Sequence, residues 1–371
     1  MPYEIKDRLS LKIFFEDSEF PFEKANSLEF LHISCSTRVG VPMFHLGLKD
    51  NIGYFSNSDY LKDATKVTFV IQPNESETSD TYVFRINSYR GTSDVEMDGY
   101  LDTPQYWHGS QTEPLKGTSS SVISQIAAAT GLNAKVTSTV DTQTWFPRNI
   151  YYFEWARQIS ERGYRSDYSC MQLALTENRE IRYLDLQDTP VPAGTFSFPS
   201  PTSGQFLFTD FRPTAASGSM NHQTAYQESR VQQMVIGPLK SSTLSTSNFK
   251  KIDPQGNILV SSKVKSEVLQ SRVKYSPISS GNVHPFYEQA LYQNRRLSNL
   301  FLNKFEALTV ERTGLTVLDY VQVNYDDPLS TNSRSFKGTY WISAHAIYIH
   351  GNNYYEKFEL VSNTSRSVSN A

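Results

Sequence analysis

Alternation of apolar and polar residues is the feature that most restricts how this chain can fold. Apolar side chains recur at every second position in four segments of the first hundred residues: Leu9 to Phe15, Leu31 to Cys35, Val67 to Ile71 and Tyr82 to Ile86. A period of two places such side chains on one face of a β-strand. A fifth strand is predicted over 41–50, which is entered through a proline and followed by turn residues. Residues 1–100 are therefore predicted to form a first antiparallel β-barrel or sandwich.

Residues 101–190 have a different pattern and are predicted to form a small mixed α+β domain. Proline, glycine and polar residues interrupt the regular pattern between 100 and 118, which marks a domain boundary. A short helix is predicted from Ser121, after several N-capping hydroxyls, to a stop at Gly131. A second helix is predicted over 151–162, where apolar residues recur at three- and four-residue steps before Gly163. Strands are predicted at 171–175 and 181–184.

The rest of the chain returns to strand patterns after a second predicted linker at 190–204, where proline and glycine are frequent. A long helix is predicted over 285–304, with Pro285 in its first turn and apolar residues at helical spacing. Residues 363–371 are mostly polar and are predicted to be a flexible tail. Strands are predicted at 206–208, 224–236, 257–264, 307–311, 319–325, 340–349 and 354–360.

Composition and charge exclude several classes of protein. Hydrophobic residues make up 38% and aromatic residues 13% of the 371 residues, which is typical of a folded chain. The 35 Lys and Arg residues do not outnumber the 38 Asp and Glu residues, so no overall basic field attracts nucleic acid. No apolar run reaches membrane-spanning length, and the N-terminus has no apolar signal core. The chain is therefore expected to fold in a cytoplasm, without a membrane span.

No catalytic or cofactor-binding residue is predicted. The sequence contains no nucleophile elbow, zinc-protease helix, phosphate-binding loop, dinucleotide-binding loop or EF-hand loop. The adjacent acids Asp326 and Asp327 precede Pro328 in a predicted hairpin loop, where acidic residues are ordinary turn formers. The chain is therefore predicted not to be an enzyme.

The cysteines and histidines also predict no metal site. Cys35 and Cys170 lack the spacing of zinc ligands, and two cysteines cannot form a disulfide framework. Cys35 falls on the apolar phase of a strand, which predicts a small buried side chain. His345 and His350 are five residues apart on a predicted strand, so they are expected on opposite faces and not around one ion.

Adjacent aromatic residues occur in three predicted regular segments. Neighbours in a strand point to opposite faces, so one member of each pair is predicted to be core and the other surface or interface. Aromatic enrichment at subunit contacts favours a protein partner over a sugar. The pairs are Tyr151-Tyr152, Tyr340-Trp341 and Tyr354-Tyr355.

Three stretches of the sequence, in this order, resemble the phage tail baseplate central hub proteins, which are similar to the N-terminal hub part of the type VI secretion protein VgrG. Residues 121–132 are similar to a helix of that family that ends in a Gly-Leu step. Residues 153–164 are similar to its aromatic helix ending in Gly and an aromatic residue, although Trp155 and Gln158 depart from the usual residues. The segments 308–323, 338–347 and 354–360 look like its closing barrel.

One turn departs from that family. Its closing barrel usually has Pro-Gly-Asp before the central strand, whereas this chain has Val317-Leu318-Asp319 and keeps only the aspartate. The departure concerns this local turn, and the topology is expected to be the same.

The resemblance implies a fold and an assembly. It implies a mainly β chain with two hub-type antiparallel barrels, a small α+β domain at 101–190 and an insertion at 237–304 with the helix 285–304. The second barrel is then split between 205–236 and 305–362. It further implies a homotrimer whose six barrels surround a pore.

The implied function is a structural virion protein at the tail baseplate, assembled in the host cytoplasm. The ring is expected to join the six-fold tail tube to the three-fold spike or cell-puncturing protein, to contact other baseplate proteins, and to let DNA pass without specific binding. The chain ends soon after the last predicted strand, so spike and lysozyme functions are expected on separate proteins. The alternatives are the tail-tip hub of a non-contractile tail, a carbohydrate-binding module that uses the Tyr and Trp pairs, and a cell-wall hydrolase.

Overall fold

A computed structural model gives the fold of most of the chain. The described residues are 3–5, 9–22, 27–38, 40–73, 78–147, 150–166, 169–208, 210–213, 228–236, 242–248, 251–252, 258–259, 273–277, 304–325, 337–351 and 353–361. Among these residues, the side chains of 3–5, of residue 73 and of those between 211 and 277 are not described. The fold is mainly β, and three helices occur among these residues.

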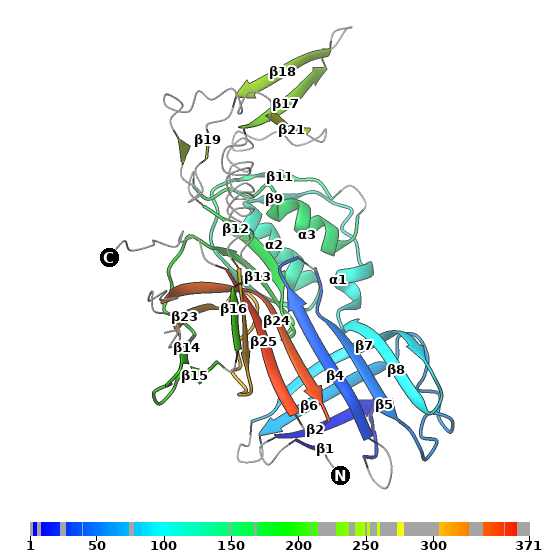
Figure 1. Ribbon diagram of the computed structural model, residues 1–371. Coiled ribbons are helices and arrows are strands. Elements are labelled where there is room, and N and C mark those ends of the chain that lie inside the picture. The colour runs from blue at the N-terminus through cyan, green and yellow to red at the C-terminus, as the bar shows by residue number, and fades with distance from the viewer. Residues whose placement is uncertain are drawn as a thin grey trace.

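One 15-stranded sheet organises the molecule (Figure 1). Its first part is antiparallel throughout, in the order β1-β2-β6-β7-β8-β5-β4, with β3 beside β2. The strands are β1 Tyr3–Ile5, β2 Leu9–Phe15, β3 Ser18–Glu19, β4 Ser27–Ser36, β5 Met43–Lys49, β6 Lys66–Pro73, β7 Asp80–Arg90 and β8 Asp94–Leu101. The five strands predicted from alternation in this region are confirmed, whereas β1, β3 and β8 were not predicted.

The second part of the sheet is built from two segments of the later chain, 194–213 and 304–361. Its strands are β14 Gly194–Phe198, β15 Phe206–Leu207, β16 Asp210–Pro213, β22 Lys304–Thr309, β23 Tyr320–Tyr325, β24 Gly338–His350 and β25 Asn353–Val361. One branch runs β24-β23-β14-β15 and another runs β24-β25-β22-β16. The pairs β23-β14 and β14-β15 are parallel, and the other pairs are antiparallel.

Strand β24 joins the two parts because a bulge changes its neighbour. Its first residues pair with β23, for example Trp341 with Tyr320, and its last seven pair with β4. The register against β25 shifts between Ile342 and Ala344, which leaves Ser343 as the extra residue. The Ser343 hydroxyl donates to the Glu359 carbonyl at 3.1 Å. A bulge bends its strand and increases the local twist, so one strand serves both parts of the sheet.

A helical module lies at one end of the sheet and comprises the elements from α1 to β13, residues 104–185 (Figure 1). Strands β10, β13 and β12 form a small sheet, and β9 pairs with β11. The Thr118 side chain caps α2 by accepting from Ser121 N at 3.2 Å, as the N-capping hydroxyls predicted. The elements are α1 Pro104–His108, β9 Leu115–Gly117, α2 Ser119–Ala129, β10 Asn133–Val136, β11 Gln143–Trp145, α3 Tyr152–Ser160, β12 Met171–Leu175 and β13 Glu180–Asp185.

The packing of α3 accounts for two residues in the segment that was predicted as an aromatic helix ending in glycine. Trp155 of α3 is 2% exposed and packs in the core that the module shares with the first part of the sheet. Gly163 follows the helix where a Cβ would lie 1.7 Å from the Tyr183 hydroxyl oxygen. Only glycine fits this close approach without a shift of its neighbours.

Separate cores lie under the two parts of the sheet. The first continues from the strands into the helical module, through residues such as Phe69 and Ile126. The second surrounds Phe196, whose ring stacks on Phe208 at 4.7 Å between centroids and lies 5.3 Å from that of Phe358. A third cluster between module and sheet includes Cys170, Leu186, Leu318, Tyr320 and Trp341.

The structure corrects three predictions in the later part of the chain. The predicted linker 190–204 contains β14, because Phe196 is needed at the centre of the second core. Strand β17 Glu228–Ile236 pairs with β18 Ser242–Asn248 and β21 Val273–Pro277 in a separate sheet and not in the large sheet. Lys304, predicted as the last residue of a helix, begins β22, where it pairs with Val361; the rest of that helix, 285–303, lies outside the described residues.

The segment 257–264 is described only at β20 Ile258–Leu259, which pairs with β19 Lys251–Ile252. The predicted tail 363–371 lies outside the described residues. No helix in the described part of the chain is long and apolar enough to cross a membrane.

The turn before β23 places a leucine in a backbone conformation that favours glycine. Leu318 has φ of 64°, in the left-handed region that favours glycine, and is 1% exposed. Its amide donates to the Ile342 carbonyl at 2.8 Å. Burial of the leucine side chain offsets a backbone cost of about 1–2 kcal/mol.

Candidate functional site

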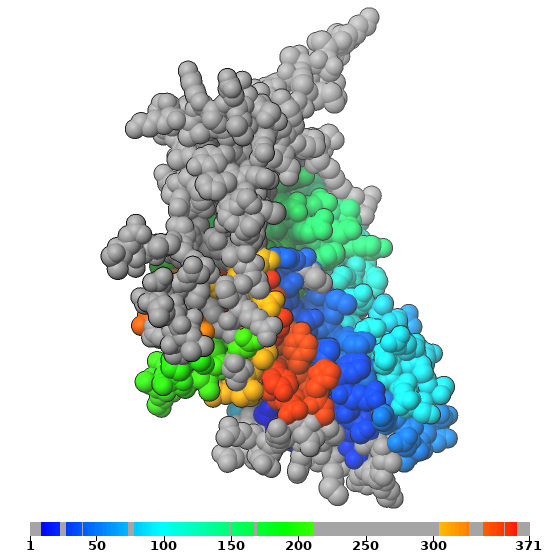
Figure 2. Space-filling model, in the orientation of Figure 1, coloured from blue at the N-terminus to red at the C-terminus, as the bar shows by residue number. Residues whose placement is uncertain are grey.

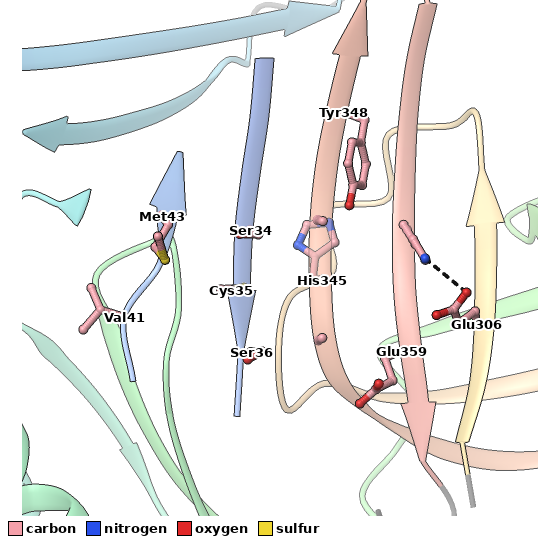
Figure 3. A pocket seen from close by; sticks show the side chains of 12 residues that line it. Ser34, Cys35, Ser36, Val41, Met43, Glu306, His345, Tyr348 and Glu359 are labelled. Carbon is pink, nitrogen blue, oxygen red and sulfur yellow. Dashed lines mark ion pairs between the residues drawn. The ribbon is translucent and has the colours of Figure 1, made fainter. Parts of the chain in front are cut away.

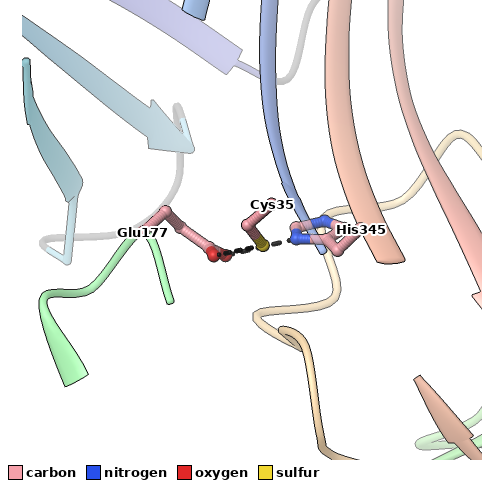
Figure 4. Close-up of side chains that lie close together, drawn as sticks. All are labelled: Cys35, Glu177 and His345. Atoms are coloured by element: carbon pink, nitrogen blue, oxygen red, sulfur yellow. Dashed lines mark hydrogen bonds and ion pairs between the residues drawn. The ribbon is translucent and has the colours of Figure 1, made fainter. Parts of the chain in front are cut away.

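The most unusual buried site joins the two parts of the sheet to the helical module. Cys35, Glu177 and His345 point toward one another there, and their side chains are at most 4% exposed (Figure 4). The Cys35 thiol donates to Glu177 Oε2 at 2.9 Å, and His345 Nδ1 lies 3.2 Å from Glu177 Oε1. We refer to these three residues as the junction cluster.

Sheet register and one turn bring the junction cluster together. Cys35 of β4 pairs directly with His345 of β24, just after the bulge. Glu177 lies in the turn between β12 and β13, where Arg179 has φ of 60° and its amide donates to the Thr176 carbonyl at 3.1 Å. The helical module therefore supplies the carboxylate, and the large sheet supplies the thiol and the imidazole.

A second carboxylate completes the surroundings of His345. Glu356 Oε2 lies 3.7 Å from His345 Nε2. The hydroxyl groups of Tyr354 and Thr313 each donate to Glu356 at 2.5 Å, which holds this carboxylate in place. On the other side of the cluster, the Thr316 hydroxyl donates to Glu177 Oε2 at 2.7 Å.

Burial and the neighbouring charges set the protonation of these groups. Burial raises the pKa of Glu177, but interactions with His345, Cys35 and Thr316 outweigh it and lower the pKa to about 2. Burial lowers the pKa of His345, but Cys35, Glu177 and Glu356 together raise it well above its ordinary value. Burial and the Glu177 charge raise the pKa of the Cys35 thiol to about 11.

This protonation pattern does not favour nucleophilic catalysis. A catalytic cysteine reacts as a thiolate and needs access for a substrate. Cys35 is a protonated thiol at neutral pH and is 4% exposed. The geometry instead allows the cluster to bind the module to the sheet, either through its ion pairs or through a shared cation.

A second polar cluster lies on the exposed side of the same two strands. His32 of β4 and His350 of β24 have their Nε2 atoms 2.8 Å apart. His45 of β5 lies next to His32, with 6.0 Å between ring centroids, and its Nδ1 lies 2.6 Å from Asp98 Oδ1. Partial burial, followed by the charges of His350 and His45, lowers the pKa of His32 to about 4. We refer to His32, His45 and His350 as the exposed histidine cluster.

The outer face of β4, β24, β25 and β22 forms a continuous surface (Figure 2). An open pocket of about 320 Å³ lies on it (Figure 3). Small residues such as Ser34 and Ala346 are among those that line it, and Lys357 pairs with Glu306 across neighbouring strands at 3.1 Å.

Several other cations on the sheet are also paired. Lys304 lies 3.2 Å from Glu359, and Arg85 lies 2.6 Å from Asp102. Arg90 forms an ion pair with Glu96. Direct pairing of this kind reduces the positive potential that the surface presents to a polyanion.

The structure confirms one prediction about histidine and limits the one about Cys35. His345 is buried and His350 is exposed, so they lie on opposite faces as their spacing predicted. Cys35 is buried as predicted, but its thiol contacts a carboxylate and does not serve only as a small apolar group. Asp326 and Asp327 lie outside the described residues.

The aromatic pairs follow the prediction except in β24. Tyr354 is buried and Tyr355 is partly exposed, and Tyr151 is 49% exposed beside the partly buried Tyr152. Tyr340 and Trp341 are both buried, which corrects the prediction. The helical module covers the second face here, where Trp341 Nε1 donates to the Leu186 carbonyl at 3.0 Å.

Glu177 is the residue that sequence reasoning missed. It is 142 residues from Cys35 and 168 from His345, and it lies in a turn where an acidic residue is ordinary. No local pattern distinguishes it, because its burial results from docking of the module against the sheet.

Comparison with known proteins gives information on the fold alone. No protein-family model matches the chain, and no curated protein sequence matches it. Among solved structures, the 43 kDa tail protein of prophage MuSo2 from Shewanella oneidensis is similar, with a TM-score of 0.60 and 9% identity. The similarity covers 96% of this chain and 98% of that one.

Two further structures show the same similarity. The tail protein from Neisseria meningitidis MC58 has a TM-score of 0.57 at 10% identity, over 95% of this chain and 96% of that one. A chain of the Francisella PdpA–VgrG complex has a TM-score of 0.50 at 9% identity, over 97% of this chain and 53% of that one. The chain therefore has the fold of phage tail proteins and of VgrG-related proteins, as its sequence motifs indicated.

Proposed function

We propose that the protein is a structural component of a phage tail, the homotrimeric central hub of the baseplate. In this role it joins the six-fold tail tube to the three-fold spike, contacts other baseplate proteins and lines the channel through which DNA leaves. It has no enzymatic activity and resides in the virion after assembly in the host cytoplasm. The similarity to tail proteins over nearly the whole chain supports this proposal.

The observation that carries the proposal is the double use of β24. One strand pairs with β4 in the first part of the sheet and with β23 in the second part, and each part has its own core. We infer two β-barrel domains held side by side by a shared strand. Three such chains give six barrels around an axis while keeping three-fold symmetry, which is what a six-fold to three-fold adaptor needs.

We infer the following domain boundaries from this arrangement. The first barrel comprises residues 1–100, and the small α+β domain comprises 101–190. The second barrel combines 194–213 with 304–361, because β14, β15 and β16 pair within the large sheet. The insertion predicted between the two segments of the second barrel is proposed as the part that contacts other baseplate proteins.

The outer face of β4, β24, β25 and β22 is the proposed channel wall. Its pocket is lined by small residues and by the charged side chains of Glu306, Lys357 and Glu359, and Lys357 pairs with Glu306. The net charge of the whole chain is −3. Such a surface does not hold phosphates strongly, because attraction scales with the number of free cations.

The mass of the protein in solution tests the proposal. Light scattering is expected to give three times the chain mass of 42.2 kDa, and negative-stain images of the same sample are expected to show hollow rings. A monomer at all accessible concentrations, alone and with the tube and spike proteins of the same tail, contradicts it. Binding of a monomer to glycans, or hydrolysis of peptidoglycan, favours instead a carbohydrate-binding module or a hydrolase.

A further inference from the structure

We propose that the junction cluster is a zinc site, in which Cys35, His345 and Glu177 hold one ion between the sheet and the helical module. The inference does not depend on the hub function. It rests on the donor types, their geometry and the groups around them.

The donors are those that zinc prefers, and binding of the ion would displace the protons of the Cys35 thiol and of His345 Nδ1 to solvent. A thiol, an imidazole nitrogen and a carboxylate oxygen, one from each residue, lie within 4.8 Å of one another. Zinc is typically bound at about 2.0–2.3 Å by four ligands of these types, so tetrahedral ligands lie roughly 3.4–3.6 Å apart. Cys35 Sγ and Glu177 Oε2 are 2.9 Å apart, and His345 Nδ1 and Glu177 Oε1 are 3.2 Å apart. Because the three donor atoms lie within 4.8 Å of one another, side-chain shifts of up to about 1 Å would bring them to the tetrahedral spacing.

The outer groups are arranged as around a metal-bound histidine. Such a histidine usually directs its second ring nitrogen toward a carboxylate, which fixes the ring orientation. His345 Nδ1 faces the cluster, and Nε2 faces Glu356 at 3.7 Å. Nε2 is fully buried and has no hydrogen-bond partner within the described part of the chain. Closure of this gap is the adjustment expected when Nδ1 binds an ion.

The local charge also favours a cation. Glu177 and Glu356 are buried carboxylates, at 3% and 2% exposure, and His345 between them supplies one positive charge at most. Buried carboxylates are costly unless they are paired or bind a metal. The Thr316 hydroxyl, 3.8 Å from Cys35 Sγ and 2.7 Å from Glu177 Oε2, marks where a hydroxyl or a water would provide the fourth ligand.

The ion would connect three segments distant in sequence. It would link β4, β24 and the β12–β13 turn just beside the bulge at Ser343. A structural zinc ion contributes directly to folding free energy. It would therefore stabilise the position of the helical module relative to both parts of the sheet.

The test measures metal in the full-length protein. Wild-type protein from zinc-supplemented medium, purified and dialysed against a weak chelator, is expected to contain one zinc per chain by inductively coupled plasma mass spectrometry. Protein from cobalt-supplemented medium is expected to show the thiolate-to-cobalt charge-transfer band in the near ultraviolet. The ions are supplied during growth because the site is buried in the folded chain.

Cysteine variants separate this site from nonspecific binding. Cys35→Ser is expected to lose the charge-transfer band, whereas Cys170→Ser, which changes the other buried cysteine, is expected to keep it. A folded wild-type protein without stoichiometric zinc and without the cobalt band overturns the proposal, and this result does not require any variant to fold. A cobalt band lost in Cys170→Ser and kept in Cys35→Ser also overturns it.

Discussion

Strands β4 and β24 carry two histidine-containing clusters, and the two clusters have opposite properties. On the buried face, Cys35 and His345 contact Glu177, and the pKa of His345 is raised well above its ordinary value. On the exposed face, His32 contacts His350, and the pKa of His32 is lowered to about 4. The backbone pairing of β4 with β24 is the same for both clusters.

The difference shows that neighbouring side chains can outweigh burial. Burial alone lowers the pKa of both histidines. Glu177 and Glu356 contribute to raising the pKa of His345, whereas partial burial and, after it, the charges of His350 and His45 lower the pKa of His32. Opposite charges therefore raise the histidine pKa in the buried cluster, and like charges add to the lowering of the histidine pKa in the exposed cluster.

Removal of the junction carboxylate is expected to have the largest effect. Glu177→Ala leaves His345 without its closest partner and removes the acceptor of Cys35 and Thr316. Breaking a buried ion pair costs about 3–5 kcal/mol in the free energy of unfolding. Urea denaturation followed by circular dichroism measures this loss. The control is Glu96→Ala, which removes the partner of the largely exposed Arg90 and is expected to change stability by less than about 1 kcal/mol. Equal losses of unfolding free energy in the two variants would contradict the expected difference between a buried and an exposed ion pair.

Loss of a neighbouring ion pair between the module and the sheet is expected to have a smaller effect. Arg182 of β13 donates to Asp319 at 2.7 Å, to Glu180 at 2.6 Å and to the Val317 carbonyl at 3.0 Å. Arg182→Met keeps much of the side-chain volume but removes these bonds, with an expected loss of roughly 2–3 kcal/mol. Thermal denaturation measures the change. An unchanged melting temperature would show that the junction cluster alone holds the module.

The exposed histidine cluster predicts a pH dependence of stability. The folded-state pKa of His32 lies below its ordinary value of 6.5, so the unfolded chain binds the proton more tightly. Stability from this group is therefore complete above about pH 6.5 and is lost as the pH falls toward about 4.

His32→Gln tests this dependence. The urea midpoint of the wild type is expected to fall more than that of His32→Gln between pH 7 and 4.5, while acidic groups titrate equally in both. His350→Gln removes one positive neighbour and is expected to raise the pKa of His32, which NMR titration measures directly. Identical pH profiles for wild type and His32→Gln would exclude a role for this cluster.

The ion pair on the outer face is expected to have the smallest effect. Lys357 and Glu306 are 42% and 36% exposed, and exposed pairs contribute at most about 1 kcal/mol. Lys357→Gln is expected to leave the unfolding free energy within roughly 0.5 kcal/mol of the wild type. Chemical denaturation measures the unfolding free energy of both proteins. A loss of stability as large as that of Arg182→Met would contradict the solvent exposure of this ion pair.

The sequence by itself determined most strands and both longer helices of the module. Alternation at Leu9 to Phe15 and capping at Thr118 act within a few residues, so they can be recognised without tertiary information. The resemblance to the tail hub family also came from local segments, and the similarity to solved tail-protein structures confirms it. Strand β14 was not predicted because proline and glycine around Phe196 indicate a loop, and its strand conformation depends on packing in the second core.

Only the tertiary structure decided how these elements meet. The bulge at Ser343, the burial of both Tyr340 and Trp341, and the approach of Glu177 to Cys35 and His345 depend on sheet register and module docking. Periodicity assigns a side chain to a face, but it does not specify what covers that face. Contacts between residues more than a hundred positions apart arise from packing free energy summed over the whole molecule, which no short segment of sequence contains.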